Sequence, residues 1–284
     1  MNKKSLIIVF SVVFLIAASV AIFFISDGFG NNPTLSIDGT NNPADTENPN
    51  TVVVTFPEGS AAVEIAEKLE ENDVCSADDF LELVKNPSDE ILTNLGITNK
   101  SERLFTLEGY IFPDTYEFYK GENPDSVLRR FIDNFNSKIS DTDKTRAAEL
   151  GYTMDEIITI ASVIQEEAGR ADQDYKVSSV LHNRLNTGTP LQCDVTYQYL
   201  YNICEPYLPN GVTDEIANNY DSYKCPALPK GPITNPGYAS IQAALYPEQT
   251  EYFYFVTDSD MNYYYAKTWE EHCSNCHIAG IAGY

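Results

Sequence analysis

The chain contains 284 residues, of which 43% are hydrophobic and 12% aromatic, enough apolar material for a buried core in one large or two modest domains. Its 42 acidic residues outnumber its 18 basic residues and give a formal net charge of −24. Because such a chain repels polyanions, we expect no nucleic-acid partner.

The N-terminal residues are typical of a membrane anchor. Lys3 and Lys4 precede an apolar run from Leu6 to Ile25, which only two serines interrupt. About 20 such residues are enough to cross a bilayer. The pattern predicts a cytoplasmic N-terminus at residues 1–4 and a transmembrane signal anchor at residues 5–25.

The orientation of this anchor follows from the distribution of basic residues. No lysine or arginine follows the apolar run until Lys68, so the positive-inside rule makes the rest of the chain extracytoplasmic. A cleaved signal peptide is the alternative, because Ala18–Ala21 loosely resembles a cleavage site, but the apolar run continues beyond it. Residues 26–50 are rich in Asn, Pro, Gly and Asp, which predicts a disordered tether.

The segment after the tether has the pattern of a small folded unit. Thr51–Phe56 is rich in β-branched residues and predicts a strand, and Pro57–Gly59 predicts a turn. Helical periodicity follows at Ala62–Leu69, and a second helix is predicted at Ala77–Lys85.

An aromatic segment follows at Leu107–Phe118 and contains Glu108 and Asp114. Aromatic rings with interspersed carboxylates suit sugar recognition, because apolar sugar faces stack on rings and sugar hydroxyls need polar partners. An aromatic core strand explains the same pattern, so both interpretations remain open.

A carboxylate-bearing helix is predicted at about residues 154–168. Thr153 and Glu156 have the spacing of a capping box, and apolar residues then recur with helical period. The resulting apolar stripe is centred near Ile157 and Ile164.

Two adjacent glutamates at the end of this helix have different predicted environments. At about 100° per residue, Glu166 falls opposite the apolar stripe, whereas Glu167 falls at its margin. A partly desolvated carboxyl keeps its proton to higher pH and can act as a general acid near neutral pH. Glu167 is therefore the candidate acid; the alternative is that both glutamates are ordinary surface charges.

The remaining elements complete an α+β pattern. Helices are predicted at about residues 125–138, in a segment ending at Gly188 and at Ser240–Leu245. A hairpin is predicted to pair residues 252–256 with residues 262–266, and a loop at residues 220–237 is stiffened by proline. We expect an α+β fold with a small subdomain at residues 51–100 and a larger domain at residues 101–284.

Six cysteines lie in the part predicted to be extracytoplasmic, where disulfides form, but the sequence does not select a pairing. Cys273–His277 matches the pattern for covalent haem attachment, and with His272 it could also supply zinc ligands. The sequence has neither a second C-x-x-C pair for zinc nor a recognisable haem pocket. We therefore expect no cofactor and no metal.

Six segments of the chain resemble, in the same order, the YceG-like family of endolytic murein transglycosylases, the MltG type. They are Leu107–Tyr116, Ala161–Ala168, Val177–Leu185, Leu191–Thr196, Ala227–Gly237 and Tyr254–Asp258. Residues 51–100 also look like the LysM-like module that precedes the catalytic part of some cell-wall enzymes. For that module, glycan binding and a purely structural role both remain open.

The resemblance implies a lyase of cell wall biogenesis that cleaves the MurNAc–GlcNAc bond of nascent peptidoglycan strands and leaves 1,6-anhydro-MurNAc ends. It implies a bacterial cell membrane location, peptidoglycan glycan strands as substrate and penicillin-binding synthases as neighbours. In the family the sugar's own C6 hydroxyl is the nucleophile, so one glutamate serves as acid and then base. Its position corresponds to Glu167.

The resemblance also implies substrate-binding positions along a glycan cleft. These are Glu108, Asn183, Arg184, Gln192, Asp194, Thr196, Tyr223 and Asn235. From the residues alone, Arg184 could instead complement the dipole of its helix.

The chain departs from the family pattern at several positions. Asp221 stands where the family usually has Asn, Lys230 replaces a Pro and Cys193 replaces a small hydroxyl residue. An additional carboxylate at Asp221, if it lies near Glu167, would raise the pKa of Glu167.

Two other functions remain as alternatives. A muramidase-like hydrolase would need a second carboxylate, with Asp194 and Asp221 as candidates. A non-catalytic glycan-binding scaffold of the cell-wall synthesis machinery would leave Glu167 as a surface charge.

Overall fold

The computed structural model describes residues 50–281. The predicted cytoplasmic N-terminus, signal anchor and tether therefore lie outside the described residues, except for Asn50. Among residues 50–281, no helix has the length and apolarity needed to cross a membrane.

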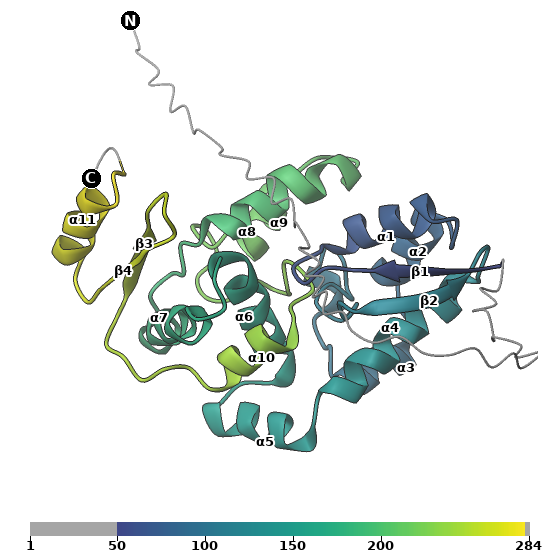
Figure 1. Cartoon of the computed structure of the whole chain (residues 1–284), viewed down its shortest axis with the longest axis horizontal. Coiled ribbons are helices and arrows are strands. Elements are labelled where there is room, and N and C mark those ends of the chain that lie inside the picture. The colour runs from purple at the N-terminus through teal and green to yellow at the C-terminus, as the bar shows by residue number, and fades with distance from the viewer. Residues whose placement is uncertain (1–49, 282–284) are drawn as a thin grey trace, which may run out of the picture. The chain divides into compact units, whose positions relative to one another are not determined.

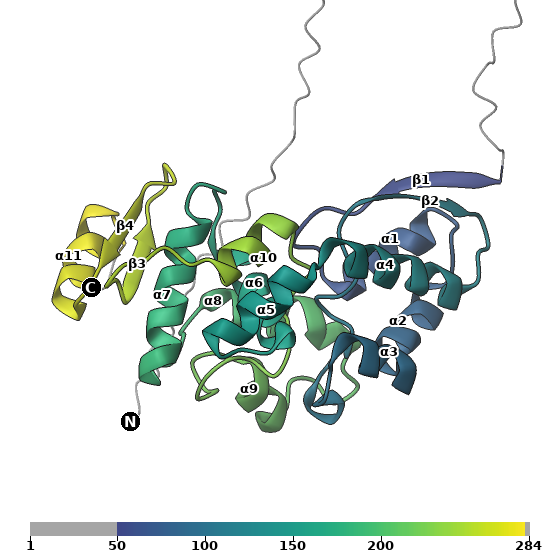
Figure 2. The same cartoon turned by 90° about the horizontal axis from the view of Figure 1, so that it is seen from below.

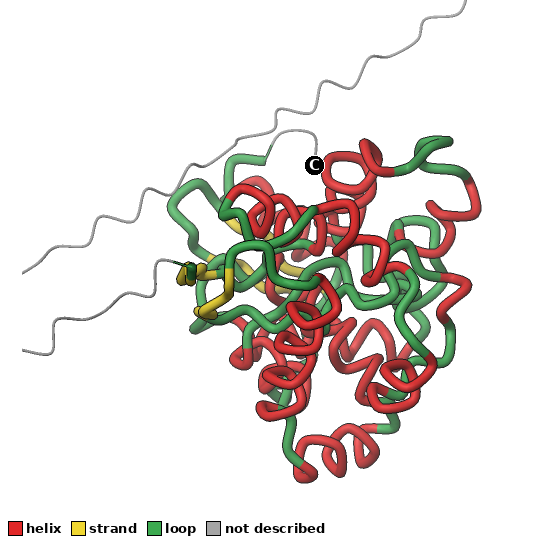
Figure 3. Tube along the Cα trace, turned by 90° about the vertical axis from the view of Figure 1, so that its right-hand side faces the viewer, coloured by secondary structure: helices red, strands yellow, loops and turns green. Residues whose placement is uncertain are grey.

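Helices dominate the described part of the chain, and the strands form two short antiparallel pairs (Figure 3). The predicted α+β class is confirmed. The helices are α1 (Ala62–Glu71), α2 (Ala77–Lys85), α3 (Asp89–Leu95), α4 (Pro124–Lys138), α5 (Asp141–Leu150), α6 (Met154–Glu167), α7 (Asp174–Thr187), α8 (Asp194–Gln198), α9 (Asp214–Tyr220), α10 (Tyr238–Leu245) and α11 (Trp269–Ile278). The strands are β1 (Thr51–Thr55), β2 (Thr115–Tyr119), β3 (Tyr254–Thr257) and β4 (Tyr263–Ala266).

The first pair of strands closes a small layer at one end of the described chain (Figures 1 and 2). Strand β1 pairs with β2, with Thr51 opposite Tyr119 and Thr55 opposite Thr115. Helix α1 packs on α2, and α2 packs on α4. The predicted strand and the two predicted helices of this segment are confirmed. Because β2 and α4 follow residue 100, this layer combines residues from both sides of the predicted boundary.

Helix α6 is surrounded by other helices and contacts α5, α7, α8 and α10 (Figure 1). Its predicted capping box is confirmed: the Thr153 hydroxyl accepts from the Glu156 amide, and the Glu156 carboxylate accepts from the Thr153 amide. Every residue from Ile157 to Ile164 is buried. The single apolar stripe predicted from the sequence is therefore too narrow, because residues 157–164 are buried on every side of the helix.

Asn235 joins three distant segments and is completely buried. Its side-chain oxygen accepts from the amides of Gly109 and Ile111, both at 2.9 Å. Its amide group donates to the Ser60 carbonyl at 2.9 Å and to Glu108 Oε1 at 2.7 Å. The proline-rich loop is thereby fixed to the entrance of α1 and to the aromatic segment.

A close approach of backbone to side chain accompanies this network. Gly109 has φ +89°, and a Cβ there would lie 2.5 Å from Pro232 Cγ. Only glycine avoids both the steric overlap and the strain of that backbone conformation.

We predict that Asn235→Ala lowers the free energy of unfolding by roughly 3–5 kcal/mol, because it leaves several buried backbone and side-chain groups without partners. Urea denaturation followed by circular dichroism measures the change. The matched control is Asn218→Ala on exposed helix surface, which should change the free energy by less than about 0.5 kcal/mol. A loss below about 1 kcal/mol for Asn235→Ala would contradict the importance of this network.

Candidate active site

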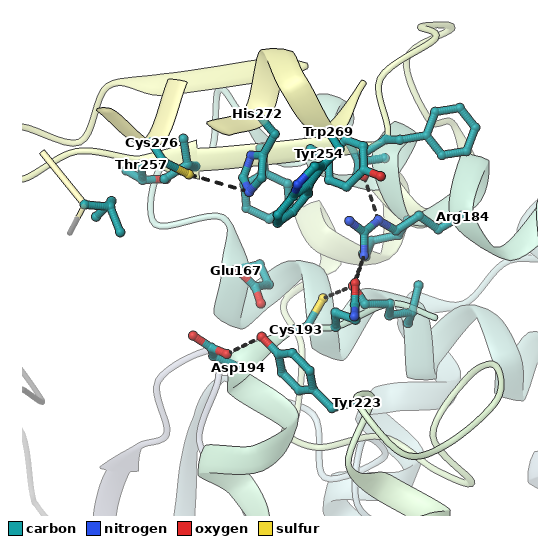
Figure 4. A pocket seen from close by; sticks show the side chains of 18 residues that line it. Glu167, Arg184, Cys193, Asp194, Tyr223, Tyr254, Thr257, Trp269, His272 and Cys276 are labelled. Carbon is teal, nitrogen blue, oxygen red and sulfur yellow. Dashed lines mark hydrogen bonds between the residues drawn. The ribbon is translucent and has the colours of Figure 1, made fainter. Parts of the chain in front are cut away.

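A pocket of about 430 Å³ lies between the ends of α6, α7 and α8 on one side and the β3–β4 hairpin with α11 on the other (Figure 4). Five of the predicted site residues line it: Glu167, Arg184, Gln192, Asp194 and Tyr223. Polar and charged side chains from separate segments therefore converge in one concave site.

Glu167 is the last residue of α6, and its carboxyl group points into the pocket (Figure 4). The Tyr263 hydroxyl of β4 donates to the Glu167 carbonyl at 3.2 Å and accepts from the Gly169 amide at 2.9 Å. This contact fixes the end of α6 against the hairpin. The predicted ordering of the two glutamates holds, since Glu167 is half-buried and Glu166 is exposed.

The pKa of Glu167 is raised to about 7. Burial is the main cause, and the negative charges of Asp194 and Glu166 act in the same direction. A hydrogen bond from the Cys193 thiol and the charge of Arg184 oppose the rise in pKa. A substantial fraction of this carboxyl is therefore protonated at neutral pH, as a general acid requires.

The neighbouring Glu166 shows why pKa alone does not identify the acid. Its pKa is also raised to about 7, mainly by burial of its carboxyl end, because the side chain folds over Gly59. However, Glu166 does not line the pocket. The position of the carboxyl group, not the ease of its protonation, separates the two residues.

Arg184 is almost completely buried and connects α7 to the segments before β3 and before α8. Its Nε donates to the Phe253 carbonyl at 2.6 Å, and its Nη1 donates to the Pro190 and Leu191 carbonyls at 2.9 and 2.7 Å. The Tyr254 ring lies over the guanidinium group, 4.9 Å from Cζ. Arg184 thus holds the hairpin in place and also brings a positive charge to the pocket, beyond the helix-dipole role considered above.

The segment before α8 forms a second wall of the pocket. Gln192 has φ 54°, a left-handed conformation that costs a non-glycine residue energy and is common where a site constrains the backbone. Asp194 accepts a hydrogen bond from the Tyr223 hydroxyl at 2.7 Å. The Cys193 thiol is fully buried between the Leu191 carbonyl, 3.7 Å away, and the Glu167 carboxyl group.

Two predicted binding residues on this side of the molecule support the wall without lining the pocket. Asn183 donates to the Thr250 and Tyr252 carbonyls at 3.0 and 2.9 Å and so holds the chain before β3. Thr196 is completely buried and bonds with the Cys193 carbonyl and the Ser222 hydroxyl. Both act on the pocket through backbone that they position.

Glu108 and Asn235 also lie outside the pocket lining. Glu108 is only 1% exposed and accepts from the Ala62 amide, the Asn235 amide group and the Tyr199 hydroxyl. Burial raises the pKa of this carboxyl to about 8 despite these donors. The structure therefore places these two residues in the polar core and not in the wall of a cleft.

Asp221 is buried and accepts from the Tyr223 amide at 3.0 Å. It does not line the pocket and is not among the groups that raise the pKa of Glu167. The carboxylate that raises this pKa from within the pocket is Asp194, not Asp221.

An aromatic wall that was not predicted from the sequence faces Glu167. Tyr254, Trp269 and His272 line the pocket from β3 and α11 (Figure 4). Helix α11 could have been predicted from the sequence, because Thr268 and Glu271 have the spacing of a capping box and form one at its start. All six cysteines are free, and within residues 50–281 no three His, Cys, Asp or Glu side chains converge on a metal position.

The model of the YceG-like family matches residues 37–277 of the chain. The chain is 32% identical over 232 residues to an endolytic murein transglycosylase of Bacillus subtilis, covering 77% of this chain and 62% of that protein. It is 25% identical over 256 residues to an endolytic murein transglycosylase of Streptococcus pneumoniae, covering 84% of this chain and 46% of that protein. The chain thus spans about three fifths or less of these relatives' lengths.

A solved structure supports the same relationship. The crystal structure of a YceG-like protein from Listeria monocytogenes aligns with a TM-score of 0.66 and 26% sequence identity, covering 78% of this chain and 75% of that one. The two proteins therefore share a fold over the aligned part of their chains.

We predict that Asp194→Asn lowers the pKa of Glu167 towards its usual value, because the substitution removes a nearby negative charge but keeps an acceptor for the Tyr223 hydroxyl. Carboxyl-carbon NMR titration measures the pKa directly. Asp221→Asn is the control and should leave it unchanged. An equal change in both variants would show that the effect is not specific to Asp194.

Proposed function

The chain belongs to the YceG-like family, and we propose that it is an endolytic peptidoglycan lytic transglycosylase. It cleaves the MurNAc–GlcNAc bond within glycan strands and leaves 1,6-anhydro-MurNAc ends. The observation that carries this proposal is the position of Glu167: its carboxyl group lies in the pocket, where burial raises its pKa to about 7. The names of the two curated relatives support the same reaction class.

The proposed reaction needs one carboxyl group that works twice. Glu167 donates its proton to the glycosidic oxygen as the bond from the MurNAc C1 to that oxygen breaks. The MurNAc C6 hydroxyl then bonds to C1, and its proton passes to the Glu167 carboxylate. The proton is returned and no water is consumed, so the enzyme ends in its starting state.

The neighbouring residues have supporting roles in this proposal. The Asp194 carboxylate stabilises the positive charge that develops at the sugar ring in the oxocarbenium-like transition state. Arg184, Gln192 and Tyr223 line the pocket and offer polar groups to the sugars and their N-acetyl substituents. Glu108, Asn183, Thr196 and Asn235 keep the walls in place.

A muramidase-like hydrolase is the second candidate, because the pocket also contains Asp194. A hydrolase needs a second carboxylate as base or nucleophile, and Asp194 is the pocket residue that fits this role. The products distinguish the reactions, since hydrolysis adds water and gives reducing ends.

We also propose a cellular setting for this activity. Residues 5–25 anchor the protein in the bacterial cell membrane, and the enzyme acts outside it beside penicillin-binding synthases. The apolar run after Lys3 and Lys4 supports the anchor. The packing of α1 on α2 after strand β1 supports a LysM-like glycan-binding module at residues 51–100, and β2, from beyond residue 100, pairs with β1.

We predict that Glu167→Gln abolishes release of anhydro-MurNAc products, with a rate loss of at least about 100-fold, because the amide cannot donate the proton. The full chain in detergent is incubated with un-crosslinked glycan strands, and the products are identified by mass spectrometry. Glu166→Gln is the matched control and should keep most activity, since Glu166 is outside the pocket.

Each other outcome of this experiment has a definite meaning. Reducing ends from the wild type would establish the hydrolase instead, with Asp194→Asn as the next variant. Loss of activity in Glu166→Gln but not in Glu167→Gln would move the acid to the other glutamate.

The proposed mechanism also fixes the direction of the pH dependence. The acid form of Glu167 starts the reaction, and its pKa in the folded protein is about 7, above the usual value for a glutamate. We therefore predict that kcat/KM falls as pH rises through about 7, approaching a tenfold loss per pH unit above it. Initial rates of anhydro-end formation across this pH range measure it; a rate that stays constant to about two units above this pKa would exclude Glu167 as the acid.

A further inference from the structure

The aromatic wall of the pocket contains the only tryptophan in the chain, Trp269. Trp269 is the first residue of α11, and 50% of its surface is exposed. It faces the same pocket as Glu167, from the opposite side (Figure 4). None of the roles assigned to Glu167, Arg184, Gln192, Asp194 and Tyr223 uses this side chain.

The Trp269 ring packs against two other rings of the aromatic wall. The Tyr254 ring lies 5.8 Å away, centre to centre, in an edge-on arrangement, and the His272 ring lies 5.4 Å away. The rings of Tyr254 and His272 stack with their centres 5.2 Å apart, and the Arg184 guanidinium group packs against the Tyr254 ring. These ring contacts restrict the rotamers of the indole, so less conformational entropy is lost when a ligand stacks on its exposed part.

The opposite side of the pocket also presents an aromatic ring. Tyr223 is 54% exposed, and its hydroxyl is bonded to Asp194. Figure 4 shows the Glu167 carboxyl group between the aromatic wall and the Asp194–Tyr223 pair. A chain of rings passing through the pocket would therefore meet an aromatic face on either side of the acid.

The charges in the pocket favour a neutral polyhydroxyl ligand at this platform. With Glu167 protonated, the Asp194 carboxylate and the Arg184 guanidinium leave the pocket lining without a net charge that would favour an ionic ligand. Arg184 uses Nε and Nη1 for backbone carbonyls of the protein. Apolar C–H faces of pyranose rings stack well on an indole, whereas their hydroxyls point sideways to polar groups.

We propose that Trp269 forms a stacking subsite for one N-acetylhexosamine ring of the glycan, next to the bond positioned at Glu167. This inference rests on the proposed function, because it names a subsite for that glycan. Trp269 touches substrate but no reacting atom, so its contribution is to binding and register.

Fluorescence of this single tryptophan tests the subsite directly. Full-length Glu167→Gln protein in detergent is titrated with un-crosslinked glycan strands and, separately, with N-acetylglucosamine oligomers that carry no peptide stems. We expect a saturable change in tryptophan emission with both probes. No change at saturating glycan, with binding shown by co-sedimentation, would overturn the proposal.

Kinetics with two matched variants separate stacking from packing. Trp269→Phe keeps a flat ring, whereas Trp269→Leu keeps apolar bulk against Tyr254 and His272 but has no stacking face. We expect Trp269→Leu to raise KM roughly three- to tenfold with little change in kcat, and Trp269→Phe to stay within about twofold of the wild type. Equal KM in Trp269→Leu and wild type, or equal losses in both variants with lower unfolding midpoints, would overturn the subsite.

The two proposals fail in different ways. A saturable fluorescence change in Glu167→Gln together with no bond cleavage by the wild type would refute the enzyme and leave the sugar subsite standing. Anhydro-MurNAc release by the wild type together with unchanged fluorescence and unchanged KM in Trp269→Leu would refute the subsite alone.

Discussion

The position of Glu167 depends on the complete burial of residues 157–164 of α6. From Ile157 to Ile164 this helix is surrounded by protein, so its polar side chains must find partners inside the fold. Ser162 does so by donating to the Thr159 carbonyl and accepting from the Ile233 amide at 3.0 Å. The helix therefore cannot rotate or slide without breaking buried contacts, and Glu167 emerges at one fixed place. At the C-terminal end of α6, the helix dipole further disfavours a negative charge on that residue.

A second buried polar group holds the chain around this helix. Asn235 and Glu108 bring together the entrance of α1, the aromatic segment and the proline-rich loop that also contacts Ser162 through Ile233. Polar networks of this kind are costly when incomplete, so they favour one arrangement of the segments over near alternatives. The sequence resemblance marked both residues as important, and the structure indicates that their importance lies in assembling the site.

The sequence predicted local features well and long-range ones poorly. The capping box at Thr153 and the hairpin at residues 252–266 depend on neighbouring residues, and both are present. Burial of residues 157–164 on all sides depends on the packing of other helices around α6, so periodicity within the helix could not show it. The burial of Glu108 could not be predicted for the same reason: its partners Ala62, Tyr199 and Asn235 come from three other segments.

Three consecutive residues at the end of α6 meet three different environments. Gln165 Oε1 accepts from the Gly237 amide and the Ser240 hydroxyl, both at 3.0 Å, at the beginning of α10. Glu166 lies over Gly59, and Glu167 enters the pocket. A helix N-terminus favours acceptors of either kind, and a carboxylate more than an amide. Gln165 therefore caps the N-terminus of α10. Of these three side chains, only Glu167 lines the pocket, whereas Gln165 is bonded to the beginning of α10 and Glu166 lies outside the pocket.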